Sequence, residues 1–216
     1  MQKSLNTRSF IIGCLICLPV AAYLFYLTYS LGMKDAFLKL NGDGGYAADQ
    51  FFRFFTYFGD AILWIPMLAY IIWKKRKLYL ALATGSFTIV TILVQVCKYF
   101  IVPDEPRPTT YITDGSLIHL VKGVDVHSIS SFPSGHTATA FTFFLMLCLM
   151  TKKSWWLPVG FITACMVGYS RIYLAQHFPL DVAAGIIVAI IGVSLSIPFQ
   201  RWIDRRNVKV SEEVKA

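Results

Sequence analysis

The chain has 216 residues, of which 56% are hydrophobic and only 15% are charged, and its mean hydropathy is +0.58. This composition excludes an ordinary soluble domain of this length and predicts an integral membrane protein. The formal net charge of +8 does not indicate a nucleic-acid partner, because the basic residues form short clusters between apolar runs, as topology signals do. All five cysteines lie inside apolar runs, so we expect them to pack as small side chains rather than to form disulfides or a zinc site.

Six apolar runs predict an all-α fold, because each approaches the roughly 20 helical residues that cross a bilayer. A cleaved signal peptide is the alternative for the first run, but the run continues well past any cleavage box, which favours an uncleaved helix. Residues 32–50 are polar and glycine-rich, which predicts a loop. The expected spanning helices cover residues 10–30, 54–73, 79–102, 136–150, 155–170 and 182–199, approximately. We predict one domain, residues 1–216, folded as a six-transmembrane-helix bundle with a short basic tail at 201–216.

Clusters of basic residues recur at alternate ends of the six predicted helices. The positive-inside rule assigns such clusters to the cytoplasm, together with both chain termini. The clusters are Lys3 with Arg8, residues 74–77, Lys152 with Lys153, and residues 201–206. The long loop at 103–135 and the segment 170–181 then lie on the opposite, extracytoplasmic face. Segments that are far apart in the sequence are therefore expected to meet in one plane.

The segment 170–181 reads Ser-Arg-Ile-Tyr-Leu-Ala-Gln-His-Phe-Pro-Leu-Asp and contains the groups needed to attack a phosphate. The imidazole of His177 is a nucleophile, and the carboxylate of Asp181 can hold one ring nitrogen as a donor so that the other keeps a free lone pair. The guanidinium of Arg171 can bind the anion through two hydrogen bonds. The same residues also fit a capped helix start after Pro179, so the interpretation depends on the rest of this face.

Two further groups are expected on the same face. Lys98 lies near the end of the third predicted helix, and Arg107 follows in a proline-rich turn. A lysine near the edge of the hydrocarbon layer often has no functional role and only extends its amine toward water, which is the alternative interpretation of Lys98. Residues 133–136, Pro-Ser-Gly-His, precede the fourth helix, and the free N–H groups of a helix N-terminus suit an anion. A simple helix cap is the alternative. So many ionisable side chains in one plane of a membrane protein are costly to bury and indicate a functional site.

These motifs resemble those of the type 2 phosphatidic acid phosphatase superfamily, which includes membrane lipid phosphatases, glucose-6-phosphatase and vanadium haloperoxidases. Residues 133–136 resemble its second signature motif, and Ser170 and Arg171 with His177 and Asp181 resemble the third. The first motif departs from the pattern. The family usually has lysine, six intervening residues and then Arg-Pro, whereas eight residues separate Lys98 from the Arg-Pro pair at 107–108. We expect the extra residues to loop out within 103–106, where helix cannot continue.

The resemblance implies a role for each matching residue. His177 would form a phosphohistidine, Asp181 would orient its ring, and His136 would protonate the leaving oxygen. Neither a metal nor another cofactor is expected. The residues expected to bind the phosphoryl oxygens are Lys98, Arg107, Ser134, Gly135 and Arg171.

The resemblance also implies a membrane lipid phosphatase acting on a lipid phosphomonoester or diphosphate. The candidate substrates are undecaprenyl diphosphate, which we favour, phosphatidate, phosphatidylglycerol phosphate and lipid A phosphates. The expected location is the cytoplasmic membrane of a bacterium, with the site facing the periplasm or exterior; the oligomeric state is left open. A lipid phosphotransferase using the same site is the nearest alternative. Less favoured are a metal-dependent hydrolase with His136, His177 and Asp181 as ligands, and a transporter or inert scaffold.

The remaining polar residues of this face receive structural interpretations. We expect the long loop, with its two histidines, to cover the site rather than to react. We expect the arginine at 53 and the aspartate at 60 to form a salt bridge or a helix cap. The two tyrosines on either side of Arg171 are expected to pack against neighbouring side chains. These residues are His119, His127, Arg53, Asp60, Tyr169 and Tyr173.

Overall fold

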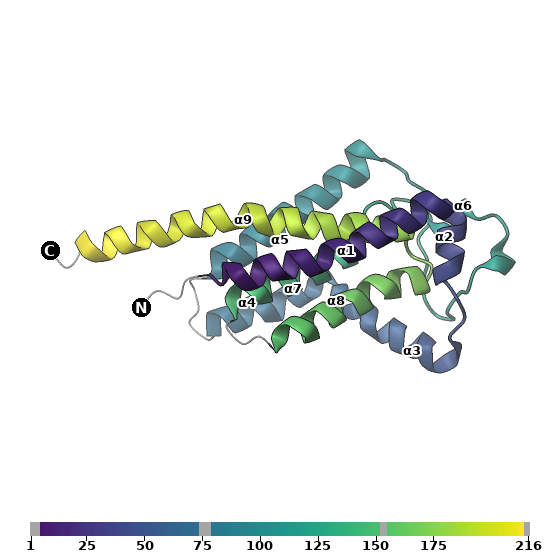
Figure 1. Cartoon of the computed structure of the whole chain (residues 1–216), viewed down its shortest axis with the longest axis horizontal. Coiled ribbons are helices and arrows are strands. Elements are labelled where there is room, and N and C mark those ends of the chain that lie inside the picture. The colour runs from purple at the N-terminus through teal and green to yellow at the C-terminus, as the bar shows by residue number, and fades with distance from the viewer. Residues whose placement is uncertain (1–4, 74–78, 152–154, 214–216) are drawn as a thin grey trace.

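The computed structural model of the protein describes residues 5–73, 79–151 and 155–213. All regular secondary structure in these residues is helical (Figure 1), which confirms the predicted fold class. The longer helices are α1 (Thr7–Leu31), α5 (Leu80–Val96), α7 (Gly135–Met150), α8 (Trp156–Tyr173) and α9 (Pro179–Glu213). The shorter ones are α2 (Met33–Leu40), α3 (Gly45–Phe55), α4 (Trp64–Trp73) and α6 (Pro108–Tyr111).

Three stretches of helix in the described residues are long and apolar enough to cross a membrane, namely Thr7–Leu31, Leu80–Ile101 and Pro179–Ile203. A fourth is possible if Gly45–Gly59 and Ala61–Trp73, which are bent by 53° relative to each other, form one broken span. Helix α7 is apolar but shorter. The protein therefore has the helices of a membrane protein, and its arrangement as six spans stays a prediction.

The predicted loop at 32–50 and the predicted span at 54–73 are wrong in detail. Helices α2 and α3 occupy most of the first, and two short 3-10 helices, η1 (Thr56–Gly59) and η2 (Ala61–Leu63), interrupt the second. The break has a local cause: the side chain of Asp60 accepts a hydrogen bond from the backbone N–H of Ile62 at 3.3 Å and so caps a new helix.

Gly59 allows this break to pack tightly against the centre of the bundle. A Cβ atom at Gly59 would lie 2.6 Å from Val167 Cγ1 and 2.8 Å from the backbone oxygen of His136. Real side chains do not tolerate such distances, so only glycine fits between α7 and α8 here. The broken second span is therefore held directly against the start of α7.

The last helix is longer than predicted. Helix α9 begins at Pro179 and continues to Glu213, through the segment expected to be a tail. Residues 201–213 contain neither glycine nor proline, so no helix breaker ends it. Two basic clusters used to predict the orientation, residues 74–77 and the pair Lys152 and Lys153, lie outside the described residues, as does Lys3 of the first cluster.

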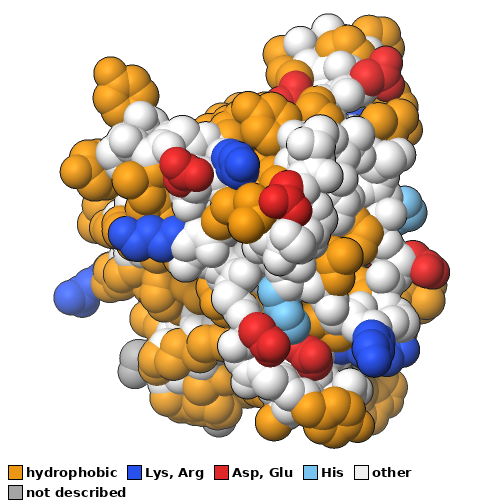
Figure 2. All heavy atoms as spheres, turned by 90° about the vertical axis from the view of Figure 1, so that its right-hand side faces the viewer, with side chains coloured by type: hydrophobic (Ala, Val, Ile, Leu, Met, Phe, Trp, Pro, Cys, Tyr) orange, Lys and Arg blue, Asp and Glu red, His pale blue; other side chains and the backbone are white. Residues whose placement is uncertain are grey.

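Helix α9 is the centre of the packing and contacts α1, α5 and α7. A Cβ atom on Gly185 would lie 2.7 Å from the backbone oxygen of Ser134, which shows how closely the first turns of α9 approach the start of α7. The loops after α5 and α8 gather at one end of the molecule, on the right of Figure 1, opposite the end at which both termini lie. Seen from that end (Figure 2), the surface mixes acidic, basic and histidine side chains with hydrophobic ones.

Candidate active site

His177 lies in the tight connection between α8 and α9. Helix α8 ends at Tyr173 with Leu174 as its C-cap, and Ala175 adopts a left-handed conformation with φ of 54°. The backbone N–H groups of Gln176 and His177 then both donate to the carbonyl oxygen of Arg171, at 2.9 and 3.1 Å. Pro179 begins α9, a position that suits its fixed φ. One turn of chain therefore holds the guanidinium-bearing residue and the histidine together.

Asp181 lies in the first turn of α9 beside the buried ring of His177. Its Oδ2 is 3.4 Å from Nδ1 of His177 and accepts hydrogen bonds from the backbone N–H of Phe178 at 2.9 Å and from the Ser131 hydroxyl at 2.5 Å. A carboxylate beside Nδ1 favours the tautomer that carries its proton there, which leaves the lone pair on Nε2. This is the arrangement that a nucleophilic imidazole needs.

The surroundings of His177 also keep its ring neutral. Burial and the nearby charges of Arg171, Arg107 and Lys98 lower the pKa of His177 well below its ordinary value of 6.5. Only the neutral imidazole has a free lone pair, so the ring is in its reactive form at neutral pH.

Ser131 is a site residue that the sequence did not reveal. It is fully buried, its hydroxyl lies 3.5 Å from Nδ1 of His177, and its backbone N–H donates to the carbonyl oxygen of Glu105 at 3.0 Å. In the sequence it is one of three serines within residues 128–131, and nothing in the pattern singles it out. Only the fold brings it to Asp181.

Arg107 extends from the long loop to the turn that carries His177. Its Nε donates to the carbonyl oxygen of Ile129 at 3.0 Å, and its Nη1 donates to both the backbone oxygen and Oε1 of Gln176, each at 3.0 Å. Burial lowers the pKa of Arg107, and Asp181 opposes that effect. A guanidinium remains charged in proteins despite such a shift. Gln176 thus fixes this cation next to His177, although no motif in the sequence marks it.

Arg171 is also buried, with 7% of its surface exposed. Its Nη1 donates to the hydroxyl of Thr56 in η1, while its Nε is buried and has no hydrogen-bond partner among the described residues. A buried donor without a partner is costly. Its presence here marks a position at which an acceptor, such as a phosphate oxygen, would be stabilised.

Lys98 lies at the end of α5, where the helix widens into a single π-turn, Cys97–Ile101. The backbone N–H of Val102 donates to the carbonyl of Cys97 at 2.9 Å, which closes this wider turn. The residues between Lys98 and Arg107 that exceed the usual spacing of the first motif are therefore accommodated partly in this wider helical turn and partly in the turn at 103–106, where Asp104 has φ of 57°. The amine of Lys98 donates to the backbone oxygen of Ser130, next to Ser131.

The start of α7 forms the remaining wall. Ser134 caps this helix, since its Oγ accepts from the backbone N–H and the hydroxyl of Thr137 at 3.4 and 2.9 Å. Its own N–H donates to the carbonyl of Asp181 at 3.0 Å, so the two motifs are joined directly. The hydroxyl hydrogen of Ser134 remains able to donate to an anion. Gly135 is the first residue of the helix and His136 the second.

Two cavities open beside these residues. One, of about 290 Å³, is lined by His136, Arg171, Gln176, Arg53 and Thr56, together with residues 123–125 and others of the long loop. The other, of about 540 Å³, is lined by Arg107 and residues 126–130. The long loop thus forms walls of both cavities, and its His127 lines both.

An apolar groove of about 390 Å³ lies between α4, α7 and α8. Phe58 of η1 lines it, and its chain neighbours Thr56 and Tyr57 line the polar cavity. The polar cavity and the apolar groove are therefore adjacent along η1.

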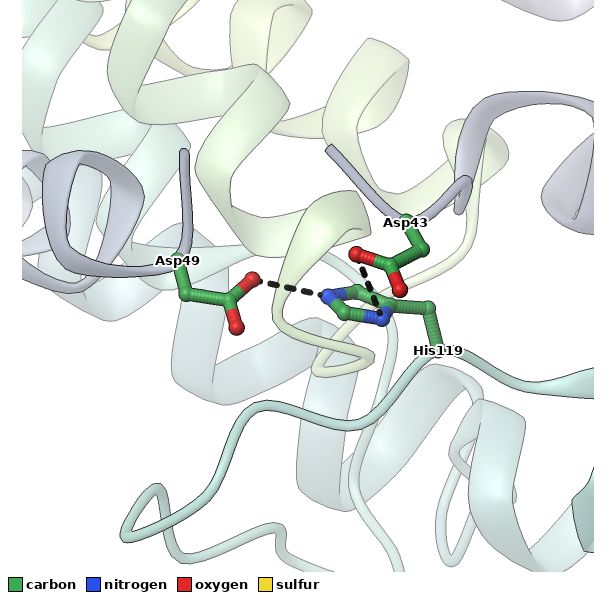
Figure 3. A group of neighbouring side chains, drawn as sticks. All are labelled: Asp43, Asp49 and His119. Carbon is green, nitrogen blue, oxygen red and sulfur yellow. Dashed lines mark hydrogen bonds and ion pairs between the residues drawn. The ribbon is translucent and has the colours of Figure 1, made fainter. Parts of the chain in front are cut away.

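His119 connects the long loop to the hairpin between α2 and α3 (Figure 3). Its Nε2 is 2.9 Å from Asp49 Oδ1 and its Nδ1 is 3.8 Å from Asp43 Oδ1, and the hydroxyl of Tyr173 donates to Asp49 at 2.7 Å. In the described part of the chain, Asp43, Asp49 and His119 are side chains of the kind that bind metal ions, and their potential ligand atoms lie within 4.8 Å of one another. The alternative set of His136, His177 and Asp181 does not form such a group.

The other structural expectations have mixed outcomes. The cap at Asp60 is confirmed, and Tyr169 and Tyr173 both pack on Phe52. Among the ion pairs of the described residues, none joins Arg53 to Asp60; Arg53 lines the polar cavity instead.

The comparisons with known proteins agree with the geometry. The PAP2 superfamily matches residues 76–205, which is more than half of the chain. An undecaprenyl-diphosphatase of Sulfolobus acidocaldarius is 36% identical over 61% of this chain and 61% of its own length. A lipid A 4'-phosphatase of Bacteroides thetaiotaomicron is 30% identical over 64% of this chain and 65% of its own length. The chain thus spans less than two thirds of these curated relatives.

A solved structure is similar as well. The crystal structure of Aquifex aeolicus LpxE is matched with a TM-score of 0.66 and 30% sequence identity, over 76% of this chain and 93% of that one. The matched region of the family includes Lys98, Arg107 and the other residues of the candidate active site except Arg53, Thr56 and Tyr57, which line the polar cavity. The chain belongs to the PAP2 superfamily.

Proposed function

We propose that this protein is a membrane lipid phosphatase that releases phosphate from a lipid phosphomonoester or diphosphate through a phosphohistidine at His177, without a metal. The observation that carries the proposal is the buried His177 ring, with Asp181 3.4 Å from Nδ1 and Arg171 in the same turn. Lys98 and Arg107 add two cations around the same point, which suits a phosphate and repels a divalent metal ion.

In the first step, Nε2 of His177 attacks the phosphorus atom, and the bond from phosphorus to the leaving oxygen breaks. The electron pair of that bond stays on the leaving oxygen, which takes a proton from His136. Lys98, Arg107 and Arg171 stabilise the charge on the transferred phosphoryl oxygens, with the Ser134 hydroxyl and the N–H of Gly135 as further donors. In the second step, the oxygen of a water molecule attacks the phosphorus while His136 takes a proton from that water. The bond from phosphorus to Nε2 of His177 breaks with its electron pair on Nε2, inorganic phosphate leaves, and both imidazoles return to their starting states.

The substrate class follows from the two openings of the site. The charged groups bind a phosphate, and the apolar groove beside η1 suits an acyl or prenyl chain. Undecaprenyl diphosphate is the substrate we favour, because relatives of this chain are named for it. Lipid A phosphates, phosphatidate and phosphatidylglycerol phosphate are the other candidates.

The topology completes the proposal. We place residues 1–216 in one domain with six spans, both termini in the cytoplasm, and the site at the outer face of a bacterial cytoplasmic membrane. The common position of the two termini, at the end opposite the site in Figure 1, supports this orientation.

The test uses the purified full-length protein with undecaprenyl diphosphate in EDTA. We expect release of inorganic phosphate from the wild type, and a loss of activity of about 10³-fold or more in His177→Ala, because the residual rate comes from binding alone. Lys39→Gln, an exposed change on α2, serves as the control. Full activity in His177→Ala contradicts the mechanism, and phosphate found on a second lipid rather than free in solution indicates the phosphotransferase alternative.

A further inference from the structure

Asn41 is a buried polar residue that the proposed mechanism does not use. It directly follows α2, and only 3% of its surface is exposed. Burying an amide costs free energy unless its donors and its acceptor find partners, so the partners of Asn41 show what its burial maintains. Asn41 also lies outside residues 76–205, the region that the PAP2 superfamily matches. Membership of the family therefore assigns it no role.

The side-chain amide of Asn41 caps the end of α8. Its Nδ2 donates to the backbone oxygens of Ile172 and Tyr173, at 3.0 and 2.9 Å. The last carbonyl groups of an α-helix have no partner within the helix, and here a side chain from another element supplies one. Arg171 comes directly before these two residues, and its carbonyl oxygen accepts the backbone N–H of His177 at 3.1 Å. Asn41 therefore holds the backbone between the phosphate-binding arginine and the proposed nucleophile.

The same side chain also holds the long loop. Its Oδ1 accepts a hydrogen bond from the backbone N–H of His119 at 2.8 Å, and its Nδ2 also donates to the backbone oxygen of that residue at 3.3 Å. The amide thus pairs with the backbone of His119 through both its acceptor and its donor. One buried side chain therefore joins the end of α2, the long loop over the site and the end of α8.

Two tyrosines of α8 contact the same part of the chain. The hydroxyl of Tyr169 donates to the backbone oxygen of the last residue of α2 at 3.0 Å. The hydroxyl of Tyr173 donates to Asp49 of α3 at 2.7 Å. These bonds start from side chains of α8, whereas Asn41 bonds to the backbone that leads into the turn of His177. A displacement of Asn41 is therefore passed directly to that turn.

We propose that Asn41 is a positioning residue: by holding the end of α8, it sets the position of His177 relative to the phosphate bound by Arg171, and so sets the rate of phosphoryl transfer. The inference rests on the proposed function. Misplacement of a reacting group by about 1 Å costs about 10²-fold in rate. Asn41 acts on the reaction through the backbone of α8 rather than through a contact with the substrate.

The test compares Asn41→Ala with the wild type in single-turnover experiments, with the enzyme in excess over undecaprenyl diphosphate. At saturating enzyme, the rate constant for phosphate release does not depend on the fraction of the enzyme that is folded, whereas the steady-state rate does. We expect this rate constant to fall about tenfold or more, because two hydrogen bonds to the helix end are lost and the turn shifts. A merely structural role lowers the unfolding temperature and the yield of active enzyme but leaves the rate constant unaltered.

Tyr169→Phe is the matched control. It also removes a hydrogen bond between α8 and the end of α2, but one that starts a full turn before the end of α8. We expect its single-turnover rate constant to change less than about twofold.

Asn41→Asp separates the two halves of the contact. The carboxylate has nearly the same shape and keeps the acceptor for the N–H of His119, but it cannot donate to the backbone oxygens of Ile172 and Tyr173. We expect its rate constant to fall as much as that of Asn41→Ala. A wild-type rate constant in Asn41→Asp shows that the cap on α8 does not position the turn, which overturns the proposal.

Two further results overturn the positioning role. An unaltered single-turnover rate constant in Asn41→Ala assigns Asn41 to stability alone. Equal falls in Asn41→Ala and Tyr169→Phe assign the effect to the packing of α2 on α8 as a whole. Neither result affects the proposed function, which fails separately if the wild type releases no phosphate or if His177→Ala remains active.

Tyr173→Phe covers the case in which the variants of Asn41 do not fold. It loosens the same end of α8 from a more accessible side, because it removes the bond to Asp49, whose side chain is 20% exposed. We expect its single-turnover rate constant to fall about threefold, as for one lost hydrogen bond. An unaltered rate constant in this variant contradicts the positioning of the turn through the end of α8.

Discussion

The proposed nucleophile, His177, has two neighbours that differ in how visible they are in the sequence. Asp181 follows His177 by four residues and is part of a recognisable motif, whereas Ser131 comes from a distant loop and contacts the same carboxylate oxygen. In the proposed mechanism, both residues act on the tautomer and orientation of the imidazole rather than on the phosphate.

Replacing Asp181 with asparagine tests this orienting role. Asparagine has nearly the same shape but loses the charge that favours a proton on Nδ1, so we expect kcat to fall by about 10²- to 10⁴-fold with little change in KM. Ser131→Ala removes one hydrogen bond to the carboxylate and should lower kcat by about tenfold. Steady-state kinetics on one lipid phosphate measures both. A change in KM with unaltered kcat in either variant contradicts the assignment.

The dependence of activity on pH tests the state of His177. Burial and the nearby cations lower its pKa well below 6.5, so the ring stays neutral and reactive as the pH falls through that value. We expect the acid limb of kcat/KM, which reports the free enzyme, to lie below pH 6.5. A phosphate monoester itself has a pKa of about 6. Measuring the pH dependence of activity on both a monoester and a diphosphate therefore separates the titration of the substrate from that of the enzyme. An acid limb above pH 6.5 on both substrates argues against a neutral, buried nucleophile.

At the scale of the elements, the site depends on two interruptions of helix: the π-turn that carries Lys98 and the break between α3 and α4. The π-turn places an amine at the long loop, and the break brings Thr56 to Arg171 and Gly59 to His136. Both interruptions lie in apolar runs whose composition predicts straight spans.

Gly59→Ala tests the contact between the break and α7. The added methyl group would overlap the backbone oxygen of His136 and the side chain of Val167, so we expect a loss of about 1–3 kcal/mol in stability and a lower kcat. The unfolding temperature in detergent and the rate of phosphate release measure the two effects. Gly42→Ala is the matched control, because a Cβ atom there meets no atom within 4 Å. Equal behaviour of the two variants would show that the close approach is not important.

The motif residues and the helical class were predictable from the sequence, and the supporting contacts were not. His136, Arg171, His177 and Asp181 are conspicuous because ionisable groups are rare in an apolar chain. Thr56, Ser131 and Gln176 matter only through partners at least 46 residues away or on another element, which no local pattern encodes. The break at Gly59 was missed because the apolar residues on either side read as one continuous run.

At the scale of the whole molecule, the candidate site assembles because three segments of the chain meet at the end opposite both termini. The loop after α5, the start of α7 and the turn before α9 are joined by hydrogen bonds between Ser131 and Asp181, and between Ser134 and Asp181. Helix α9 thus connects the core of the bundle with the reacting groups.

The proposed orientation can be measured in intact cells. Ser116→Cys introduces a thiol at an exposed position of the long loop, and Arg205→Cys introduces one near the end of α9. We expect a membrane-impermeant maleimide to label the first in intact cells and the second only after permeabilisation, with the wild type as the background for the native cysteines. The reverse pattern would contradict the extracytoplasmic site.

The most direct measurement of the central claim is to trap the covalent intermediate. The enzyme is mixed with a lipid phosphate labelled in its terminal phosphate, quenched in base, where phosphohistidine is stable, and mapped by mass spectrometry. We expect the label on His177 in the wild type, loss of the label on treatment with acid, and no label in His177→Ala. Label on another residue, or full turnover by His177→Ala, would contradict it.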